Sequence, residues 1–208
     1  MTDDPIRRSL ADHVALAERV AEEMAGQITE LSDAVLGTLR SGGTLLFCGN
    51  GGSAADAQHL AAEFVVRFSA DREALAALAL TTDTSILTAG GNDLGFDRVF
   101  ERQVRALGRP GDLLILHSTS GESENLVLAA RAARAAEVKS AALLAKGGGR
   151  LRSEVDLALV VPTDSTARAQ EMHITIGHIV CESVERVYAP TAEPSGATQK
   201  TAGKASDA

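Results

Sequence analysis

The feature that most constrains this chain is a glycine-rich turn between a short apolar run and an alanine-rich segment. The apolar run is Thr44–Cys48, and the turn after it has three glycines in four residues and ends at Ser53. A buried strand that leads into a glycine turn and a helix directs free backbone N–H groups and the helix dipole toward one point. This stretch therefore predicts an anion-binding site at the start of a helix over Ala54–Phe68.

A second turn of the same kind follows the apolar run Leu113–Leu116 and opens a helix predicted over Glu124–Ala136. It carries four hydroxyl side chains, on Ser118, Thr119, Ser120 and Ser123. Hydroxyl and backbone N–H groups together can surround a phosphate dianion without a fixed positive charge. In the alternative interpretation Ser123 only caps the helix and the other hydroxyls satisfy the turn, but four hydroxyls in six residues favour phosphate binding. The carboxylate of Glu122 would repel phosphate, so its side chain is expected to point away.

Short apolar runs alternate with helical segments along most of the chain. Residues 5–40 have apolar side chains at steps of three and four, which predicts two helices or one long kinked helix. Further elements are predicted as strands over Leu75–Leu80, Ser140–Leu144 and Leu157–Val161, helices over Ile86–Ala89 and Asp97–Leu107, loops over Gly90–Asp93 and Lys146–Gly149, and a closing helix over Gln170–Tyr188. This alternation predicts right-handed βαβ units and a doubly wound parallel sheet with helices on both faces. Ligands of such α/β sheets bind beyond the carboxyl ends of the strands.

The chain has 208 residues, of which 45% are hydrophobic, and this suits a single domain over 1–190. Its N-terminal helical extension, 1–41, is expected to pack on the domain and on partner subunits, although it could simply cover one face of the sheet. The segment 191–208 is rich in Pro, Ser, Gly, Thr and Lys, which predicts a disordered tail.

Charge and hydropathy exclude several classes of function. The formal net charge is −8 and no stripe of lysine and arginine is present, so nucleic-acid binding is not expected. No apolar run approaches the roughly 20 residues of a membrane span. Cys48 and Cys181 lie far apart, which predicts reduced, buried thiols in a cytoplasmic protein.

Candidate chemical groups lie on two of the predicted helices. His59 and Glu63 share one helix face at i and i+4, although a surface ion pair is the default interpretation of such a pair. The closing helix carries Gln170, Glu171, His173 and His178. Eight residues separate Gln170 from His178, about 12 Å along a helix, so one metal could bind both only through long side chains, a bend or two subunits. Glu171 and His173 are expected to be solvent-facing or structural, and His117 to serve packing.

A dinucleotide site is the weaker interpretation of the first turn. Gly49, Gly51 and Ala54 fit the G-x-G-x-x-A pattern. That pattern also requires an acidic residue at the end of the next strand, where this chain has Thr81 and Thr82. We therefore expect no nucleotide cofactor.

Four blocks of sequence together resemble the SIS-domain family, and within it the phosphoheptose isomerases. The blocks are Cys48–His59, Asn92-Asp93, Ser118–Ser123 and Gln170–His178, and the resemblance covers about residues 5–188. It implies a flavodoxin-like, five-stranded parallel sheet assembled as a homotetramer with active sites shared between subunits. It also implies that neighbouring subunits complete each site.

The resemblance also assigns roles to residues of this chain. It implies that the substrate phosphate and nearby hydroxyls bind to Ser53, Ser118, Thr119, Ser120 and Ser123. It implies sugar contacts from Asn50, Gly51, Gly52, Asn92 and Asp93. Zinc is expected on His59, Glu63, Gln170 and His178, of which Glu63 and Gln170 also contact substrate. Glu63 and His178 match the proposed acid–base pair.

The implied reaction converts sedoheptulose 7-phosphate into D-glycero-D-manno-heptose 7-phosphate for heptose nucleotide synthesis. A proton moves between C1 and C2 through an enediol, so one group must act on carbon and another on oxygen. Glu63 is the predicted base and His178 the predicted acid, and a bound metal would polarise the oxygens.

Three positions depart from the usual pattern and keep alternatives open. Glu122 stands where phosphoheptose isomerases usually have Asn, Ala167 where some have Asp, and His117 where a small or apolar residue is usual. One alternative is an SIS isomerase for another phosphosugar. Another is a non-catalytic protein similar to the SIS protein that binds the bacterial replication initiator, which this chain resembles around Thr82-Asp83 and 105–108. That protein lacks the complete His/Glu/Gln/His set, so the enzyme is favoured.

Overall fold

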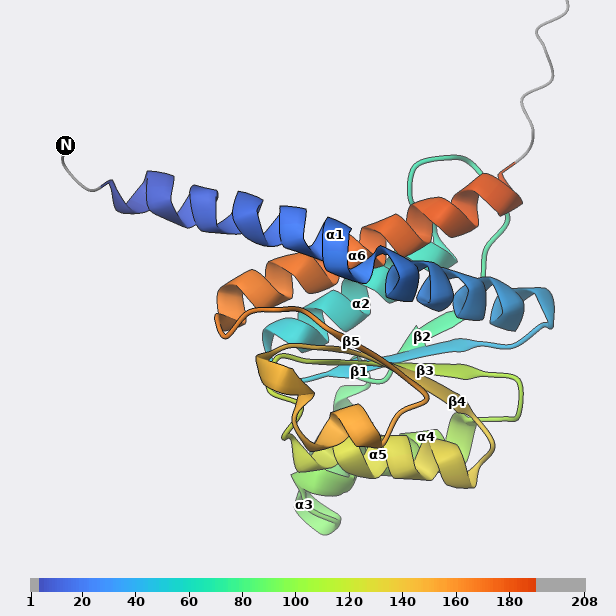
Figure 1. The fold of residues 1–208 in the computed structure, drawn as a ribbon. Coiled ribbons are helices and arrows are strands. Elements are labelled where there is room, and N and C mark those ends of the chain that lie inside the picture. The colour runs from blue at the N-terminus through green and yellow to red at the C-terminus, as the bar shows by residue number, and fades with distance from the viewer. Residues whose placement is uncertain (1–3, 190–208) are drawn as a thin grey trace, which may run out of the picture.

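The computed structural model describes residues 4–189, which form one parallel sheet between two layers of helices (Figure 1). In chain order the elements are α1 (Pro5–Arg40), β1 (Leu45–Gly49), α2 (Gly52–Val65), β2 (Ala77–Ala79), α3 (Thr84–Asp93), a 3-10 turn (Phe96–Arg98), α4 (Val99–Leu107), β3 (Leu113–Ser118), α5 (Glu124–Ala135), β4 (Lys139–Leu144), two further 3-10 turns (Lys146–Gly148 and Arg150–Ser153), β5 (Leu157–Val160) and α6 (Thr166–Tyr188). The predicted tail, 191–208, lies outside the described residues, and the domain boundary at 190 stays a prediction.

The five strands are parallel and follow the order β2-β1-β3-β4-β5. This order is that of a flavodoxin-like, doubly wound sheet, which confirms the predicted fold class. Helices α1, α2 and α6 cover one face and α4 and α5 the other (Figure 1). The central strands β1 and β3 are buried throughout, which explains why they are continuous apolar runs rather than alternating ones.

Side chains of β1 alternate between the two layers. Leu45 and Phe47 join the cluster under α1, α2 and α6, whereas Leu46 and Cys48 join the cluster over α4 and α5. Both cysteines are free and buried, as predicted, and burial raises the pKa of each thiol, that of Cys181 to about 12.

The N-terminal segment forms one helix rather than two. The side chain of Asp4 caps α1 by accepting the N–H of Ile6 at 3.0 Å, and proline follows at the first helical position. Its later turns pack on the sheet layer, while its first turns project beyond the body of the molecule (Figure 1). Ile6, Leu10 and Val14 form a stripe there that is 70%, 62% and 55% exposed. Packing of this stripe on a partner subunit stays a prediction.

The prediction that Gly90–Asp93 breaks a short helix is wrong. Helix α3 continues through both glycines to Asp93. Asp83 caps it by accepting the N–H of Ile86 at 2.9 Å, and a Cβ on Gly90 would lie 3.4 Å from Val99 of α4. A helical glycine costs only about 1 kcal/mol relative to alanine, so the cap and packing on α4 can outweigh it.

Other elements also differ from the sequence prediction in their bounds or type. The closing helix α6 begins at Thr166 because the hydroxyl of Ser165 caps it, accepting the N–H of Arg168 at 3.4 Å. Strand β2 is shorter than the apolar run that predicted it, and the segment Lys146–Gly148 forms a 3-10 turn rather than a loop. Among the helices of residues 4–189, none combines the length and apolar character that crossing a bilayer requires.

Candidate active site

The carboxyl ends of β1 and β3 lie side by side, with Gly49 in register with His117. The glycine turn after β1 and the serine loop (Ser118–Ser123) after β3 therefore open into one cavity of about 330 Å³. The cavity is lined by Asn50, Gly51, Gly52, Ser53, His117, Ser118, Thr119, Ser120, Ser123, Leu126, Thr166 and Gln170. Nine of these residues are among the predicted substrate-binding residues, so the fold brings most of that set together.

Backbone geometry explains the glycines of the first turn. Gly51 has φ of +57°, a conformation that side chains with a Cβ disfavour. A Cβ on Gly49 would lie 2.5 Å from the carbonyl oxygen of Ser53. The turn is also joined to the serine loop, because the amides of Asn50 and Asn125 exchange two hydrogen bonds of 2.9 Å. No feature of the sequence indicated that Asn125 joins the two turns.

The hydroxyls of the serine loop divide into two groups. Ser118 Oγ accepts the N–H of Gly121 at 3.0 Å and Ser120 Oγ accepts the N–H of Glu122 at 3.3 Å, so these two satisfy the turn. Ser123 stands at the N-cap position of α5, yet within residues 4–189 its side chain caps no N–H of the helix. The hydroxyls of Thr119 and Ser123 therefore remain available to a ligand.

Glu122 points away from the cavity, as expected. Its carboxylate accepts the N–H of Arg150 at 3.2 Å and lies 3.5 Å from the guanidinium of the same residue. The departure from the expected Asn at this position therefore does not put a negative charge into the cavity lining.

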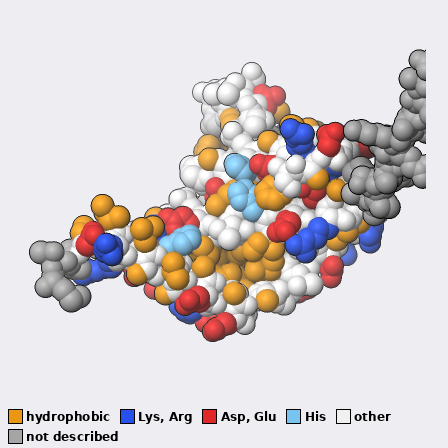
Figure 2. All heavy atoms as spheres, turned by 90° about the horizontal axis from the view of Figure 1, so that it is seen from above, with side chains coloured by type: hydrophobic (Ala, Val, Ile, Leu, Met, Phe, Trp, Pro, Cys, Tyr) orange, Lys and Arg blue, Asp and Glu red, His pale blue; other side chains and the backbone are white. Residues whose placement is uncertain are grey.

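A second group of predicted residues meets on the surface of α2 and α6. His59 Nε2 lies 3.2 Å from a carboxylate oxygen of Glu63 and 2.9 Å from Nε2 of His178. One donor atom from each of the three residues lies within 4.8 Å of the others. The side chains of His59 and Glu63 are 47% and 22% exposed, and Figure 2 shows histidines open to solvent on this side of the molecule. One chain therefore supplies all three groups.

A glycine lets the two helices approach at this cluster. A Cβ on Gly177 would lie 2.6 Å from both methyl groups of Leu60. Gly177 precedes His178 and Leu60 follows His59, so this close contact of α2 with α6 sets the two imidazoles beside each other.

Gln170 lies at the cavity instead of beside the three-residue cluster. Its amide nitrogen lies 2.4 Å from the position that a Cβ of Gly52 would occupy. Gly52 precedes His59 by seven residues on α2, which is about 10 Å along the helix. In one chain, Gln170 is thus positioned for the ligand of the cavity, and its role as a fourth metal ligand stays a prediction.

The donor set of the cluster suits a zinc ion. Two imidazole nitrogens and one carboxylate are the ligand types of catalytic zinc sites, which keep a fourth position open. Asp56 lies one turn before His59, and one of its carboxylate oxygens is buried without a partner among residues 4–189. Burial raises the pKa of Asp56, while the nearby His59 lowers it. The orphaned oxygen could hold the imidazole of a metal ligand in place.

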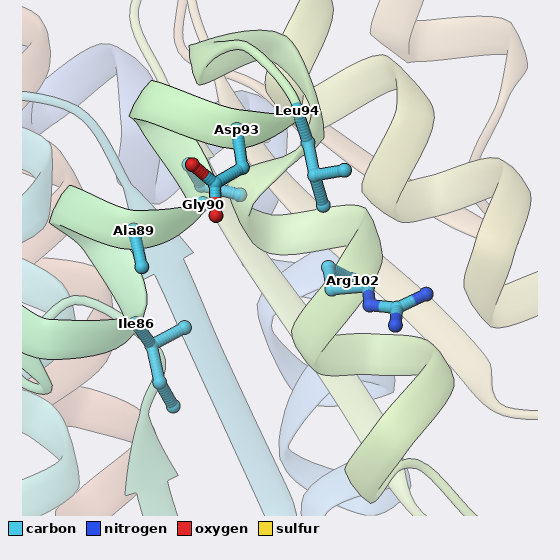
Figure 3. Close-up of a pocket in the computed structure, with 7 residues that line it drawn as sticks. Ile86, Ala89, Gly90, Asp93, Leu94 and Arg102 are labelled. Atoms are coloured by element: carbon cyan, nitrogen blue, oxygen red, sulfur yellow. The ribbon is translucent and has the colours of Figure 1, made fainter.

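Asn92 and Asp93 are not brought to this cavity within one chain. The amide of Asn92 donates to the carboxylate of Asp93 at 2.6 Å at the end of α3. Asp93 borders a separate hollow of about 350 Å³ between α3 and α4, together with Arg102 and Ile86 (Figure 3). Within one chain they lie outside the lining of the cavity, because α3 packs on α4. A contact with another subunit's substrate stays a prediction.

The remaining histidines are structural. His117 is fully buried, and burial with the neighbouring His173 lowers its pKa to about 3. His173 is buried rather than solvent-facing, its Nε2 lies 3.1 Å from the carbonyl oxygen of Leu144, and burial lowers its pKa to about 4. Glu171 instead forms a hydrogen bond with His13 Nδ1 at 2.7 Å and an ion pair with Arg168 at 2.6 Å.

Thr166 is the lining residue that the sequence prediction missed. It occupies the first position of α6 and faces the cavity across from the serine loop. The available signal was the Ser165-Thr166 pair, which is typical of a helix start, just ahead of Gln170.

Comparisons with known proteins cover most of the chain. Residues 10–145 match the family described as the SIS domain. A phosphoheptose isomerase from Roseiflexus sp. (strain RS-1) is 55% identical over 83% of this chain and 88% of its own length. One from Akkermansia muciniphila is 54% identical over 78% and 86%. The solved structure of a phosphoheptose isomerase from Neisseria gonorrhoeae superposes with a TM-score of 0.83 at 42% identity, over 87% of this chain and 97% of that one.

Proposed function

This chain belongs to the phosphoheptose isomerases of the SIS-domain family, which are aldose–ketose isomerases, and we propose that it converts sedoheptulose 7-phosphate into D-glycero-D-manno-heptose 7-phosphate. The observation that carries this proposal is the layout of α2. The helix begins at the hydroxyl-lined cavity and presents His59 and Glu63 on its later turns. An extended substrate with phosphate at one end and reacting carbons at the other suits such a helix.

The proposed chemistry assigns carbon and oxygen to different groups. Glu63 removes the proton from C1 of the ketose while His178 donates a proton to the oxygen of C2, which gives an enediol. His178 then takes the proton of the C1 hydroxyl, and Glu63 returns its proton to C2, which gives the aldose. The serine loop and the glycine turn hold the phosphate throughout, so the carbons stay beside Glu63.

We infer that zinc is held by His59, Glu63 and His178, with Gln170 of a second copy as the fourth ligand. Glu63 and His178 cannot ligate zinc tightly and act as free base and acid at the same moment, so proton transfer requires that the ion releases them. A bound ion would polarise the substrate oxygens and favour the enediol. The cluster lies at the surface of α2 and α6, which leaves room for groups from a second copy.

A homotetramer with shared sites is the proposed assembly. The exposed stripe of Ile6, Leu10 and Val14 offers apolar surface to a partner. The separation of Asn92 and Asp93 from the cavity also supports a site that a neighbouring subunit completes. The buried free thiols agree with a cytoplasmic location.

The direct test is to incubate the purified protein with sedoheptulose 7-phosphate and follow aldose formation. The expected result is turnover that a chelator abolishes and that added zinc restores. Absence of turnover under every metal condition would overturn the proposal and leave the binding-protein alternative. Faster turnover of a shorter phosphosugar would instead favour another substrate for the same reaction.

A further inference from the structure

We propose that Lys146 is a further phosphate-binding residue, which acts on the substrate through the hydroxyl of Thr166. This inference rests on the proposed function, because it requires that the substrate's phosphate occupies the cavity between the glycine turn and the serine loop.

Lys146 lies at the same edge of the sheet as the two turns. It follows β4, which pairs with β3 so that Leu144 is in register with Ser118. Its ammonium group donates to Thr166 Oγ1 at 2.9 Å, and Thr166 lines the cavity together with Ser120 and Ser123. One hydroxyl group therefore separates this cation from the phosphate site.

The chemistry of the two groups gives the hydrogen bond a direction. An ammonium group can only donate, so Thr166 Oγ1 must be the acceptor. The hydroxyl proton of Thr166 then points elsewhere, and it finds no acceptor within residues 4–189. A phosphate oxygen in the cavity would supply one. A hydroxyl that accepts from a cation is also a stronger donor, and the phosphate oxygen would lie within about 6 Å of the ammonium nitrogen.

Lys146 is free to serve this role because it has no carboxylate partner in the described part of the chain. Of the other cations nearby, Arg150 is paired with Glu122 and Glu124, and Arg168 with Glu171. Arg152 has no carboxylate partner among residues 4–189, but it neither lines the cavity nor bonds to a lining residue. The cavity lining itself contains no lysine, arginine, aspartate or glutamate. Among the described residues, Lys146 is therefore the unpaired cation that is hydrogen-bonded to the lining.

The backbone holds Lys146 firmly in this place. Its φ of +50° is unusual for a residue other than glycine. The segment after it packs against the serine loop, because a Cβ on Gly121 would lie 1.9 Å from the carbonyl oxygen of Gly148, and Leu151 N–H donates to Gly121 at 2.9 Å. The N–H of Lys146 also donates to the carbonyl of Thr163 at 3.1 Å. The backbone of Lys146 is therefore held on one side, and the segment after it is held against the serine loop.

The test compares Lys146→Met with Lys139→Met. Lys139 begins β4 at the opposite end of the sheet, so the two variants lose the same charge, and only one loses it near the cavity. We expect Lys146→Met to raise both the KM for sedoheptulose 7-phosphate and the Kd for inorganic phosphate about tenfold, equivalent to about 1.4 kcal/mol, with kcat unchanged. Lys139→Met should match the wild type, and Lys146→Arg should restore most of the affinity.

A double variant tests the path through Thr166. If the ammonium acts through the hydroxyl, Lys146→Met adds little to the effect of Thr166→Val. The tenfold difference should also shrink in about 0.5 M salt, because the exposed ammonium is screened. Fully additive effects would overturn the path, and an unchanged KM and Kd in Lys146→Met would overturn the role itself.

Phosphate binding, measured by calorimetry without turnover, separates this inference from the proposed function. A wild type that binds phosphate through Lys146 but does not isomerise the heptose would leave this inference standing and refute the function. A wild type that isomerises the heptose with no loss in Lys146→Met would do the reverse. No measurable phosphate binding and no turnover would overturn both.

Discussion

This chain contains two pairs of neighbouring histidines. Each pair has one member on α6, and the pairs differ in almost everything else. His59 and His178 lie at the surface with their Nε2 atoms 2.9 Å apart and ring centroids 5.1 Å apart. His117 and His173 are fully buried, with ring centroids 6.2 Å apart, and His117 lies against the floor of the cavity. His173 and His178 are five residues apart on α6, and each partners a histidine from a different layer.

The difference shows that surroundings, and not residue type, decide what an imidazole can do. Burial lowers the pKa of His117 and His173 to about 3 and about 4, so both stay neutral near pH 7 and cannot exchange protons with a substrate. His59 and His178 are open to solvent beside the carboxylate of Glu63. That pair can bind a cation or move a proton, so we expect the chemistry at the surface pair.

The largest effect on activity is expected when the groups at the surface cluster are removed. We expect Glu63→Gln and His178→Gln each to lower kcat about 10³-fold, because each removes a group that transfers a proton. The free energy of unfolding should change little, since these side chains are partly exposed. Kinetics and urea unfolding measure the two effects.

His13→Gln is the matched control for this experiment. His13 is also a partly exposed histidine with a carboxylate partner, Glu171, but it lies outside both pairs. Its kcat should equal that of the wild type. If either cluster variant kept more than a tenth of the activity, that residue would be removed from the mechanism.

The buried pair should instead appear in the pH dependence of stability. Because the folded pKa values lie below the ordinary 6.5, the unfolded chain binds protons first as pH falls. The stabilisation is therefore complete above about pH 7 and is lost as pH falls toward 4. Each histidine should account for about 2 kcal/mol between pH 7 and pH 5.

Urea unfolding at pH 7, 6 and 5 measures this slope. His173→Gln keeps a donor for the carbonyl of Leu144 but does not titrate, so its slope should be shallower than that of the wild type. Equal slopes in the variant and the wild type would mean that His173 does not control acid stability.

The sheet and the cavity between the two turns were predicted correctly from the sequence, for a physical reason. Buried parallel strands are continuous apolar runs, and the turns after β1 and β3 must meet because those strands are neighbours. The prediction failed where contacts between distant segments decide. Packing on α4 carries α3 through two glycines, and the amide pair of Asn50 and Asn125 joins two turns that are far apart in sequence.

The residues of the surface cluster were predicted from the sequence, but their meeting within one chain could not be predicted. Helical spacing alone left it open whether His178 would reach His59 within one chain. The answer depends on how closely α6 approaches α2, and that distance is set at Gly177 against Leu60. A glycine inside an apolar helix was the available signal, but its partner helix could not be known from spacing.

The most selective effect is expected at this contact. In Gly177→Ala the new Cβ would lie 2.6 Å from both methyl groups of Leu60. Leu60 is buried, so its side chain has little room to turn away, and we expect α2 and α6 to separate slightly. Such overpacking costs about 1–3 kcal/mol. Gly26→Ala is the matched control, because a Cβ on that α1 glycine has nothing within 4 Å in the described structure, and it should stabilise the protein by about 0.5–1 kcal/mol.

Zinc affinity and kcat should fall in Gly177→Ala, because His59 and His178 move apart, while the pH dependence of stability set by His173 stays unchanged. If Gly177→Ala lost stability yet bound zinc as the wild type does, the distance between α2 and α6 would not control the surface pair. The Gly177–Leu60 contact would then stabilise the fold without positioning His59 and His178.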